Sequence, residues 1–339
     1  MTNKIIQWYN TNRRDLPWRR TKEPYKIWVS EIILQQTQIK KGKSYYVQFI
    51  NTFPNIKTLS QSNDTKVLKL WQGLGYYNRA LNMLETARNV VQNYNGIFPS
   101  KYDDLMRLKG IGEYTAAAIS SICIDESKAV VDGNVYRVLS RVFNISEAIN
   151  SSAGKNKIKN IANKLLPPIN SGTYNQAIMD FGSIQCTKHN PNCNKCPINN
   201  NCIAYIKNII NTRPVKIRKI KKKYRYLNYL YISNKSKFII QQRGIEDIWK
   251  KMYELPLIES NSAITIEKVK VDKCLNKFII IDIKKDLEMK HLLSHQCLKI
   301  VFWHISVKCL NSKHRIISKK KISQYPIPKP IERYFEIKH

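Results

Sequence analysis

Acidic residues are scarce in this chain. Its 339 residues include 24 Asp and Glu against 58 Lys and Arg, which leaves a formal net charge of +34. A surplus of this size favours a polyanionic partner such as nucleic acid. The chain is also rich in Lys, Asn and Ile together, as an AT-rich coding sequence would make it. The charge alone is therefore only moderate support for such a partner.

Long apolar runs and a secretory leader are also lacking. The longest apolar stretches, such as Phe278–Ile281, are far too short to span a bilayer. Residues 1–18 are amphipathic and interrupted by Arg13, Arg14 and Asp15, unlike a signal peptide. We therefore expect a soluble, cytoplasmic protein with no membrane partner. A hydrophobic content of 43% excludes a disordered polycation, and the length indicates about two domains.

The sequence pattern changes about two thirds of the way along the chain. Residues 1–206 carry apolar residues at helical spacing, over Lys26–Phe49, Asp64–Leu70, Asn78–Asn93, Tyr114–Ile124 and Asn134–Phe143. Residues 207–224 read as a basic linker, and no repeat of fixed period is visible. Residues 225–339 predict a second domain of α+β type, with strands near Tyr224–Ser233, Phe238–Arg243, Lys277–Ile283 and Lys299–Val307 and a helix near Ser262–Lys273.

Four of the eight cysteines lie close together. Cys186, Cys193, Cys196 and Cys202 leave six, two and five residues between successive thiols. Four thiolates suit zinc or an iron–sulfur cluster, and the spacing leaves both open. The remaining cysteines are scattered singly in apolar stretches, which favours buried reduced thiols.

Two glycines one residue apart, Gly110 and Gly112, lie between amphipathic helical segments. Such a turn can present its amides to a phosphate and lead into a helix N-terminus. An ordinary connection between helices is the alternative interpretation. The basic domain around the turn favours a helix-hairpin-helix that grips a DNA backbone.

Glu31 lies in an apolar setting, flanked by Trp28, Val29, Ile32 and Ile33. Burial among such residues would favour the protonated carboxyl. Gln35 and Gln38 follow at i+4 and i+7, which predicts a polar stripe on one helix face, a surface suited to reading bases. An exposed helical glutamate is the alternative.

Asp132 directly precedes a predicted helix. Asp is common as an N-cap there, and the helix dipole would keep its carboxylate ionised. One acid kept protonated and one kept anionic are what cleavage of a sugar C–N bond requires. The first activates the leaving group and the second stabilises the oxocarbenium ion.

These residues belong to a set of motifs that resembles the adenine DNA glycosylases of the MutY type, in the helix-hairpin-helix iron–sulfur DNA glycosylase family. The motifs are Leu16-Pro17-Trp18-Arg19, Ser30–Gln38, Gly73–Tyr77, Leu108–Ala116, Asp132-Gly133-Asn134, Asn175–Asp180 and the four clustered cysteines. The resemblance implies an all-α helix-hairpin-helix glycosylase domain with an iron–sulfur loop, followed by an α+β Nudix-like domain. It also implies a [4Fe–4S] cluster on the four cysteines.

The resemblance implies a role for each matching residue. Glu31 would protonate adenine at N7, Asp132 would stabilise the deoxyribosyl cation, and Tyr114 and Asn134 would support that intermediate. The base must be extruded from the helix before it can react. The residues implied for holding the extruded adenine are Arg14, Trp18, Arg19 and Gln176, and those implied for wedging into the gap are Gln36 and Tyr76.

Tyr114 is the most discriminating residue of the set. In related glycosylase/lyases a lysine amine at this hairpin position forms a Schiff base, and a phenol cannot do so. We therefore expect a monofunctional enzyme that leaves an abasic site. Two alternatives are an endonuclease III-like glycosylase/lyase acting on oxidised pyrimidines and a DNA-binding protein with decayed catalysis.

The C-terminal domain resembles the Nudix-like domain of the same family more loosely. Leu293-Ser294-His295 aligns with the loop that senses 8-oxoguanine, although the family usually has an aromatic residue at position 293. The glutamate-rich Nudix box is missing, so we do not expect pyrophosphate hydrolysis. The implied substrate is double-stranded DNA with an A:8-oxoguanine or A:G mispair. The protein is expected to act as a monomer in the cytoplasm of a bacterium, associated with the nucleoid.

Overall fold

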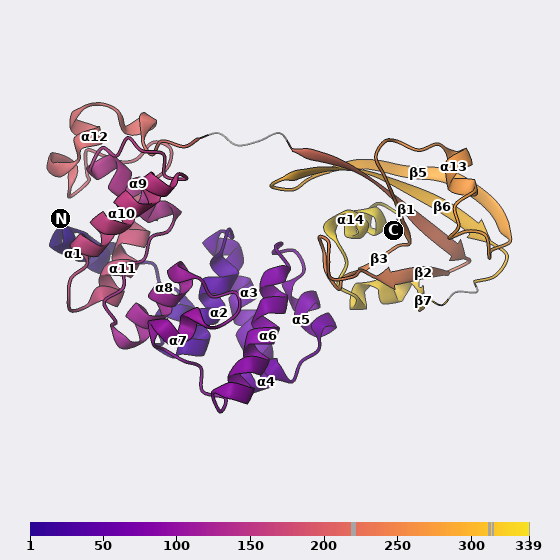
Figure 1. Cartoon of the computed structure of the whole chain (residues 1–339), viewed down its shortest axis with the longest axis horizontal. Coiled ribbons are helices and arrows are strands. Elements are labelled where there is room, and N and C mark those ends of the chain that lie inside the picture. The colour runs from indigo at the N-terminus through magenta and orange to yellow at the C-terminus, as the bar shows by residue number, and fades with distance from the viewer. Residues whose placement is uncertain (218–221, 311–312, 314, 339) are drawn as a thin grey trace. The chain divides into compact units, whose positions relative to one another are not determined.

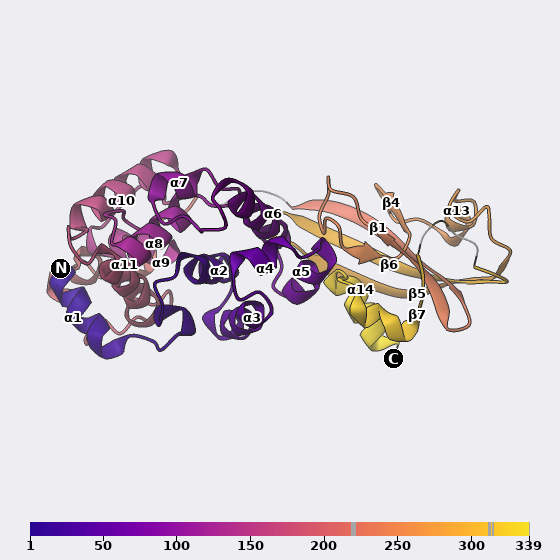
Figure 2. The same ribbon diagram turned by 90° about the horizontal axis from the view of Figure 1, so that it is seen from below.

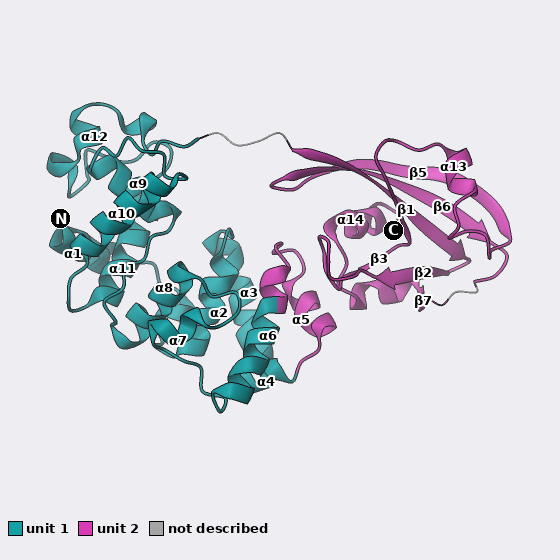
Figure 3. Ribbon diagram, viewed as in Figure 1, with its two compact units in different colours: residues 1–61, 82–218 teal, residues 62–81, 219–339 magenta. Residues whose placement is uncertain are grey.

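The computed structural model of the chain describes residues 1–217, 222–310, 313 and 315–338. The chain divides into two compact units, residues 1–61 with 82–218 and residues 62–81 with 219–339 (Figure 3). No helix within the described ranges is long and apolar enough to cross a membrane.

The chain up to residue 217 is helical between its loops (Figure 1). Its α-helices are α1 Thr2–Asn12, α2 Pro24–Leu34, α3 Ile39–Thr52, α4 Ile56–Ser60, α5 Asp64–Trp71, α6 Asn78–Asn93, α7 Tyr102–Met106, α8 Glu113–Ile124, α9 Gly133–Val142, α10 Ser152–Leu165, α11 Ser171–Asp180 and α12 Ile203–Ile206. A 3₁₀ turn covers Pro17–Arg19, and a π-helical turn over Phe181–Gln185 continues α11. The predicted helical domain is confirmed.

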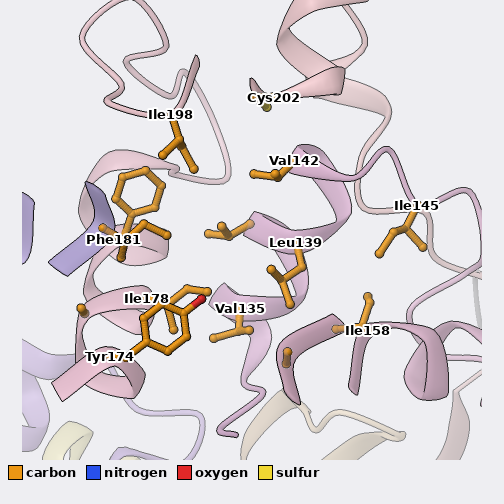
Figure 4. Close-up of a cluster of buried hydrophobic side chains, with 14 of the residues drawn as sticks. Val135, Leu139, Val142, Ile145, Ile158, Tyr174, Ile178, Phe181, Ile198 and Cys202 are labelled. Carbon is orange, nitrogen blue, oxygen red and sulfur yellow. The ribbon is translucent and has the colours of Figure 1, made fainter. Parts of the chain in front are cut away.

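One apolar core surrounds α9 (Figure 4). Val135, Leu139 and Val142 recur at i, i+4 and i+7 and are buried on one face of this helix. They pack against Tyr174 of α11 and against the cysteine-rich segment at Cys202. The helix that begins at Asp132 is therefore fixed in the same core as a cysteine of the predicted cluster.

The single helix predicted over Lys26–Phe49 is divided. Gln36 has a left-handed backbone with φ of 54°, which no α-helix accommodates, so α2 ends at Leu34 and α3 begins at Ile39. Gln35 and Gln38 consequently do not continue the face of the helix that carries Glu31. The prediction of a polar stripe along one helix is wrong.

Part of the predicted basic linker is attached to the helical unit. The N–H of Ile149 donates to the Val215 carbonyl at 3.0 Å, and the side chain of Asn150 bonds both backbone groups of Ile217 at 2.9 Å. Residues up to 217 are therefore not a free tether. Residues 218–221 lie outside the described part, and the first strand begins at Lys223.

The C-terminal part contains a mixed sheet with strand order β3-β2-β1-β6-β5, in which β4 also pairs with β1 and β7 with β2. Strands β1 and β6 are parallel and the other neighbours are antiparallel. The elements are β1 Lys223–Asn234, β2 Lys237–Gln242, β3 Tyr253–Glu254, β4 Leu257–Ser260, α13 Ile266–Lys270, β5 Ile280–Leu292, β6 Gln296–Val307, β7 Arg315–Ser318 and α14 Lys329–Ile337. The α+β prediction is confirmed.

The two helices cover opposite faces of this sheet (Figures 1 and 2). Val269 of α13 is buried in a cluster with Leu230 and Trp303. Tyr334 of α14 stacks on Phe302, with ring centroids 4.2 Å apart. Side chains alternate between faces along a strand, so Phe302 and Trp303 point to opposite sides.

Strands β5 and β6 are joined by a tight turn. Leu292 is in register with Cys297, and the N–H of Leu293 donates to the Gln296 carbonyl at 2.9 Å. Ser294 and His295 occupy the exposed end of this hairpin. The segment predicted to sense 8-oxoguanine is thus a hairpin tip.

Candidate active site

A cavity of about 400 Å³ lies within the helical unit. It brings together side chains from segments that are far apart in the sequence. Eight predicted site residues line it, namely Arg14, Trp18, Arg19, Glu31, Tyr114, Asp132, Asn134 and Gln176. The wall also includes Gln38, which was predicted only as part of the polar stripe with Glu31. The other lining residues were not predicted, namely Leu16, Ile27, Ser30, Leu34, Thr37, Ile39, Ile122, Met179, Asp180 and Ser183.

Glu31 projects from α2 and is only 7% exposed. The Tyr114 hydroxyl donates to Glu31 Oε2 at 2.8 Å. Burial raises the pKa of Glu31 from its ordinary 4.5 to about 7, although the hydrogen bond from Tyr114 opposes the shift. The nearby Asp132 charge raises this pKa further. The predicted burial of Glu31 is confirmed, and its carboxyl can hold a proton near neutral pH.

Asp132 is the N-cap of α9, as predicted. Its Oδ1 accepts the backbone N–H groups of Asn134 and Val135, both at 2.8 Å, and its Oδ2 accepts Asn134 Nδ2 at 2.7 Å. Burial raises the pKa of Asp132, whereas these donors and Arg137 lower it. The net effect is a raised pKa for Asp132. The helix N-terminus alone predicted that the carboxylate would be kept ionised, and burial opposes that prediction. Three N–H donors nevertheless match the anionic form of this carboxyl.

Asp180, at the end of α11, holds two arginines beside the cavity. Arg19 donates to Asp180 Oδ2 and Oδ1 at 2.6 and 2.7 Å, and Arg14 donates to the same carboxylate. Asp180 is completely buried, which raises its pKa, but the hydrogen bonds from Arg19 and Arg14 bring the pKa below its ordinary value. The sequence motif included this acid, but we assigned it no role. A sequence signal for this role of Asp180 was available, because Asp180 is an acidic residue at the end of a helix whose other residues are mostly buried.

Two further lining residues are held by aromatic neighbours. The Tyr9 hydroxyl donates to Gln176 Oε1 at 3.2 Å, and Trp18 meets the Tyr46 ring edge-on at 5.2 Å between centroids. These contacts restrict the rotamers of both side chains before any ligand arrives. The cavity is therefore preorganised on the side of Trp18 and Gln176.

Several predicted site residues do not line the cavity. Gln35 Nε2 donates to Thr115 Oγ1 at 3.5 Å, and Gln36 lies in the left-handed turn after α2. Tyr76 belongs to the other unit, where it is 49% exposed with φ of 50°. Ser294 and His295 also lie in that unit, at the β5–β6 turn, with Ser294 Oγ 3.1 Å from His295 Nδ1.

The two glycines of the predicted hairpin lie between α7 and α8. Gly110 has φ of +79°, and a Cβ there would come within 3.0 Å of Asn82 Cβ, so glycine is required on both counts. Gly112 is the N-cap of α8 and supplies no side-chain cap to the first turn. The first amides of α8 are thus left for another acceptor. Lys109, which directly precedes Gly110, forms an ion pair between its Nζ and Glu85 Oε1 at 2.6 Å.

The four clustered cysteines line one cavity together with Arg141. Arg141 is 2% exposed, and its Nη1 donates to Cys186 Sγ at 3.4 Å and to the Thr187 carbonyl at 2.7 Å. Burial, with the neighbouring thiols adding to it, raises the pKa of Cys196 to about 11. In the described ranges no three His, Cys, Asp or Glu side chains are arranged to hold a metal ion as they stand. The four thiols on one cavity are nevertheless the ligand type that zinc or an iron–sulfur cluster takes.

Arg137 connects α9 to the cysteine segment. Its Nε donates to the Cys186 carbonyl and its Nη2 to Asn134 Oδ1, both at 2.8 Å. Asn134 in turn donates to Asp132. The loop that carries the cysteines and the carboxylate at the cavity are therefore joined through two side chains.

Comparison with known proteins agrees with this arrangement. Residues 29–168 match the family model described as HhH-GPD superfamily base excision DNA repair protein, and residues 228–336 match a NUDIX domain model. A solved thermostable thymine-DNA glycosylase has 31% sequence identity and a TM-score of 0.57, covering 61% of this chain and 95% of its own. The fold and the cavity thus define a helix-hairpin-helix base excision repair glycosylase with an appended Nudix-like domain.

The most informative relatives extend over both domains. The adenine DNA glycosylase of Buchnera aphidicola subsp. Schizaphis graminum is 36% identical, covering 98% of this chain and 97% of its own. That of the subspecies Baizongia pistaciae is 39% identical, covering 87% and 83%. The chain belongs to the adenine DNA glycosylase family.

Proposed function

We propose that this protein removes adenine mispaired with 8-oxoguanine or guanine in double-stranded DNA, leaving an abasic site. The observation that carries the proposal is the pair of acids in one cavity. Glu31 has a pKa near 7 through burial, and Asp132 accepts three N–H donors. Membership of the adenine DNA glycosylase family supports the choice of base.

The protonated Glu31 carboxyl is the proton donor in this mechanism. As the bond between C1′ and N9 breaks, its electron pair moves into the adenine ring, and the proton from Glu31 goes to N7. The base then leaves as neutral adenine. A general acid works best when its pKa lies near the operating pH, which the burial of Glu31 provides.

Asp132 stabilises the positive charge that develops on the sugar. Its carboxylate is held in place by Asn134 and by the first backbone amides of α9, so it need not reorient during the reaction. Water then adds to C1′, and the proton that it releases goes to the Glu31 carboxylate left by the first step, which completes hydrolysis. Tyr114, hydrogen-bonded to Glu31, keeps the acid beside the reacting base.

The lining of the cavity favours a monofunctional glycosylase over the lyase alternative. No lysine is among its described lining residues, and the hairpin position expected to hold the Schiff-base amine is Tyr114. The alternative of decayed catalysis is disfavoured because both acids and their hydrogen-bond partners are in place.

The remaining predicted residues would bind the substrate, with the protein acting as a monomer. Arg14, Trp18, Arg19 and Gln176 would surround the extruded adenine, and Gln36 with Tyr76 would fill the gap in the duplex. The amides near Gly110 and Gly112 would meet a phosphate. Ser294 and His295 would contact the base opposite the adenine. Gln35 would support the cavity wall through its hydrogen bond to Thr115.

Cys186, Cys193, Cys196 and Cys202 would hold a [4Fe–4S] cluster. When bound, the cluster would supply a structural crosslink that orders the loop around Lys188 and Lys195. Arg141 would remain against Cys186, because it is anchored to the Thr187 and Lys188 carbonyls. Iron and sulfide analysis of the purified protein tests this assignment, and a fully active zinc-loaded protein would contradict it.

Single-turnover excision from duplexes with adenine opposite 8-oxoguanine, guanine or cytosine tests the proposed function. We expect adenine release in the first two duplexes and strand breakage only after alkali. Glu31→Gln should bind the same duplexes without excising. Release of an oxidised pyrimidine with spontaneous strand cleavage would favour the lyase, and binding without any product by the wild-type protein would favour decayed catalysis.

A further inference from the structure

Within the part of the C-terminal unit that the structure describes, no helix covers one half of a sheet face. On the face that carries Leu230 and Trp303, α13 covers the half distant from the β5–β6 turn. Strands β1, β5 and β6 continue well past α13 toward that turn (Figures 1 and 2). The same face then presents exposed residues, Tyr224 at 58% among them.

Exposed and half-buried residues form a row across three strands on this face. Tyr226 of β1 is in register with Lys299 of β6, and Lys299 is in register with Lys290 of β5. Residues in register share a face and lie close together. Tyr224, two residues before Tyr226, points to the same side. We call Tyr224, Tyr226, Lys290 and Lys299 the sheet patch.

Lys299 is held in a defined position within the sheet patch. Its ammonium lies 5.0 Å from the centroid of the Tyr226 ring and 5.6 Å from that of Tyr224. It also donates to the Tyr226 hydroxyl oxygen at 3.3 Å. Two ring faces and a hydrogen bond restrict a side chain that is usually mobile, so less entropy is lost when it meets an anion.

The acids nearby do not neutralise the sheet patch. Glu288, in the next row of β5 on this face, is paired with Lys285 at 2.6 Å. Glu259 of β4 is in register with Leu227 and bonds Arg225, which point to the opposite face. Lys222, two residues before Tyr224, adds to the positive charge at this end of the sheet. The patch therefore offers two unneutralised ammonium groups and a phenol.

We propose that the sheet patch is a phosphate clamp for the DNA backbone. Lys299 and Lys290 supply the charges. The Tyr226 hydroxyl accepts from Lys299 and can therefore donate its own hydrogen to a phosphate oxygen. All four residues of the sheet patch lie in the C-terminal unit.

DNA is the occupant because the clamp is continuous with the hairpin tip. Lys290 lies at the end of β5 and Lys299 near the start of β6, the two strands joined by the turn with Ser294 and His295. The inference rests on the proposed function in one respect, that the tip meets the base opposite the adenine. The strand carrying that base would then pass over the patch, and its phosphates would be the anions nearest to Lys299.

The test compares two charge-matched double variants of the full-length protein. Lys290→Ala with Lys299→Ala removes both ammonium groups of the clamp. Lys268→Ala with Lys270→Ala removes two exposed charges from α13 in the same unit. Affinity for an undamaged fluorescent duplex is measured by anisotropy between about 50 and 200 mM salt, with thermal melting as the check on folding.

The clamp variant should bind more weakly, and its log–log salt slope should be shallower by about 0.9 for each phosphate that is no longer neutralised, hence about 1.8 for two. The α13 variant should keep the wild-type slope. Equal slopes in clamp variant and wild type, or equally reduced slopes in both double variants, would overturn the clamp. Because the duplex contains no mispair, this outcome is independent of adenine excision, and failure of excision in the wild-type protein would refute only the proposed function.

Discussion

The cavity in the helical unit and the hairpin tip in the C-terminal unit use polar residues in opposite ways. Glu31 and Asp180 in the cavity are buried, and their pKa values move in opposite directions. Ser294 and His295 at the tip are exposed and bond chiefly to each other. The difference is one of environment, because the cavity removes water from its acids and the tip does not.

This comparison separates reactivity from recognition. The proposed proton donor, Glu31, needs a raised pKa, and burial provides it. The proposed contact of the tip with a base in a duplex needs exposure, so its precision would come from the residues that anchor the base of the hairpin. Arg225 Nη1 donates to Gln296 Oε1 at 3.2 Å, and Trp249 packs against His291 at 6.0 Å between centroids.

Removing the proposed proton donor, Glu31, should have the largest effect. Glu31→Gln should lower the single-turnover rate by about a hundredfold to ten-thousandfold, because the amide cannot protonate the leaving base. Asp132→Asn should act similarly through loss of the negative charge. Glu147→Gln, which loses a surface pair with Lys157, is the control and should keep the wild-type rate. A fast Glu31→Gln enzyme would show that the acid is another residue.

Replacing Asp180, the buried acid that pairs with Arg14 and Arg19, should have the next largest effect, on stability. Asp180→Asn leaves Arg14 and Arg19 without their shared anion, so the free energy of unfolding should fall by about 3 to 5 kcal/mol in urea titrations. The matched control is Asp15→Asn, which breaks an exposed pair with Arg20 and should leave the midpoint unchanged. Equal urea midpoints in both variants would mean that the buried ion pairs of Asp180 contribute no more to stability than the exposed pair of Asp15 with Arg20.

The excision rate should depend on pH through Glu31. In the proposed mechanism Glu31 must be protonated, so the rate should fall about tenfold for each pH unit above the folded pKa of about 7. Asp132 must stay ionised, and burial raises its pKa, so protonation of Asp132 should lower the rate again at acidic pH. The stability that the raised pKa of Glu31 contributes is fully present below the unfolded value near 4.5 and is lost as the pH rises through 7. Tyr114→Phe removes a hydrogen bond that lowers this pKa, so its inflection should lie higher. If the pH–rate profile of Tyr114→Phe has the same inflection as that of the wild type, the inflection does not report the titration of Glu31.

Loosening the root of the hairpin should have the smallest effect. Gln296→Ala removes one hydrogen bond to Arg225, so the preference for 8-oxoguanine over guanine opposite adenine should fall by about twofold to tenfold. The rate on the A:G duplex should not change. Gln324→Ala, an exposed glutamine of the same unit, serves as the control. A lower rate on both duplexes would show that Gln296 acts on the fold rather than on discrimination.

Sequence reasoning located the cavity because its residues occur in recognisable motifs. It failed where a local backbone state overrides periodicity. Lys26–Phe49 contains no Pro, and its polar run Gln35–Gln38 has no Gly to mark a break, yet the left-handed Gln36 divides the segment into two helices. Side-chain partners were equally hidden, since nothing in the sequence pairs Asp180 with Arg14 across 166 positions.

In the C-terminal domain, composition decided what could be predicted. Strands β1, β2 and β6 were found from their β-branched and aromatic runs. The strand predicted at Lys277–Ile283 overlaps only the start of β5, because the charged residues between Lys284 and Lys290 interrupt the apolar pattern. Strand β3, at Tyr253–Glu254, is too short to show any alternation. Helix α14 buries Ile331, Tyr334 and Phe335 at helical spacing, so its pattern was present in the sequence but was not used.

The most direct test is a pH titration of the Glu31 carboxyl, monitored by carbon NMR of protein that is ¹³C-labelled at the glutamate side chains. The Glu31 resonance is assigned as the one that is missing from the spectrum of Glu31→Gln. We predict a carboxyl that titrates with a pKa of about 7, well above the exposed glutamates. A Glu31 carboxyl that is already ionised near its ordinary value of 4.5 would contradict the account, because the cavity would then contain no proton for the departing base.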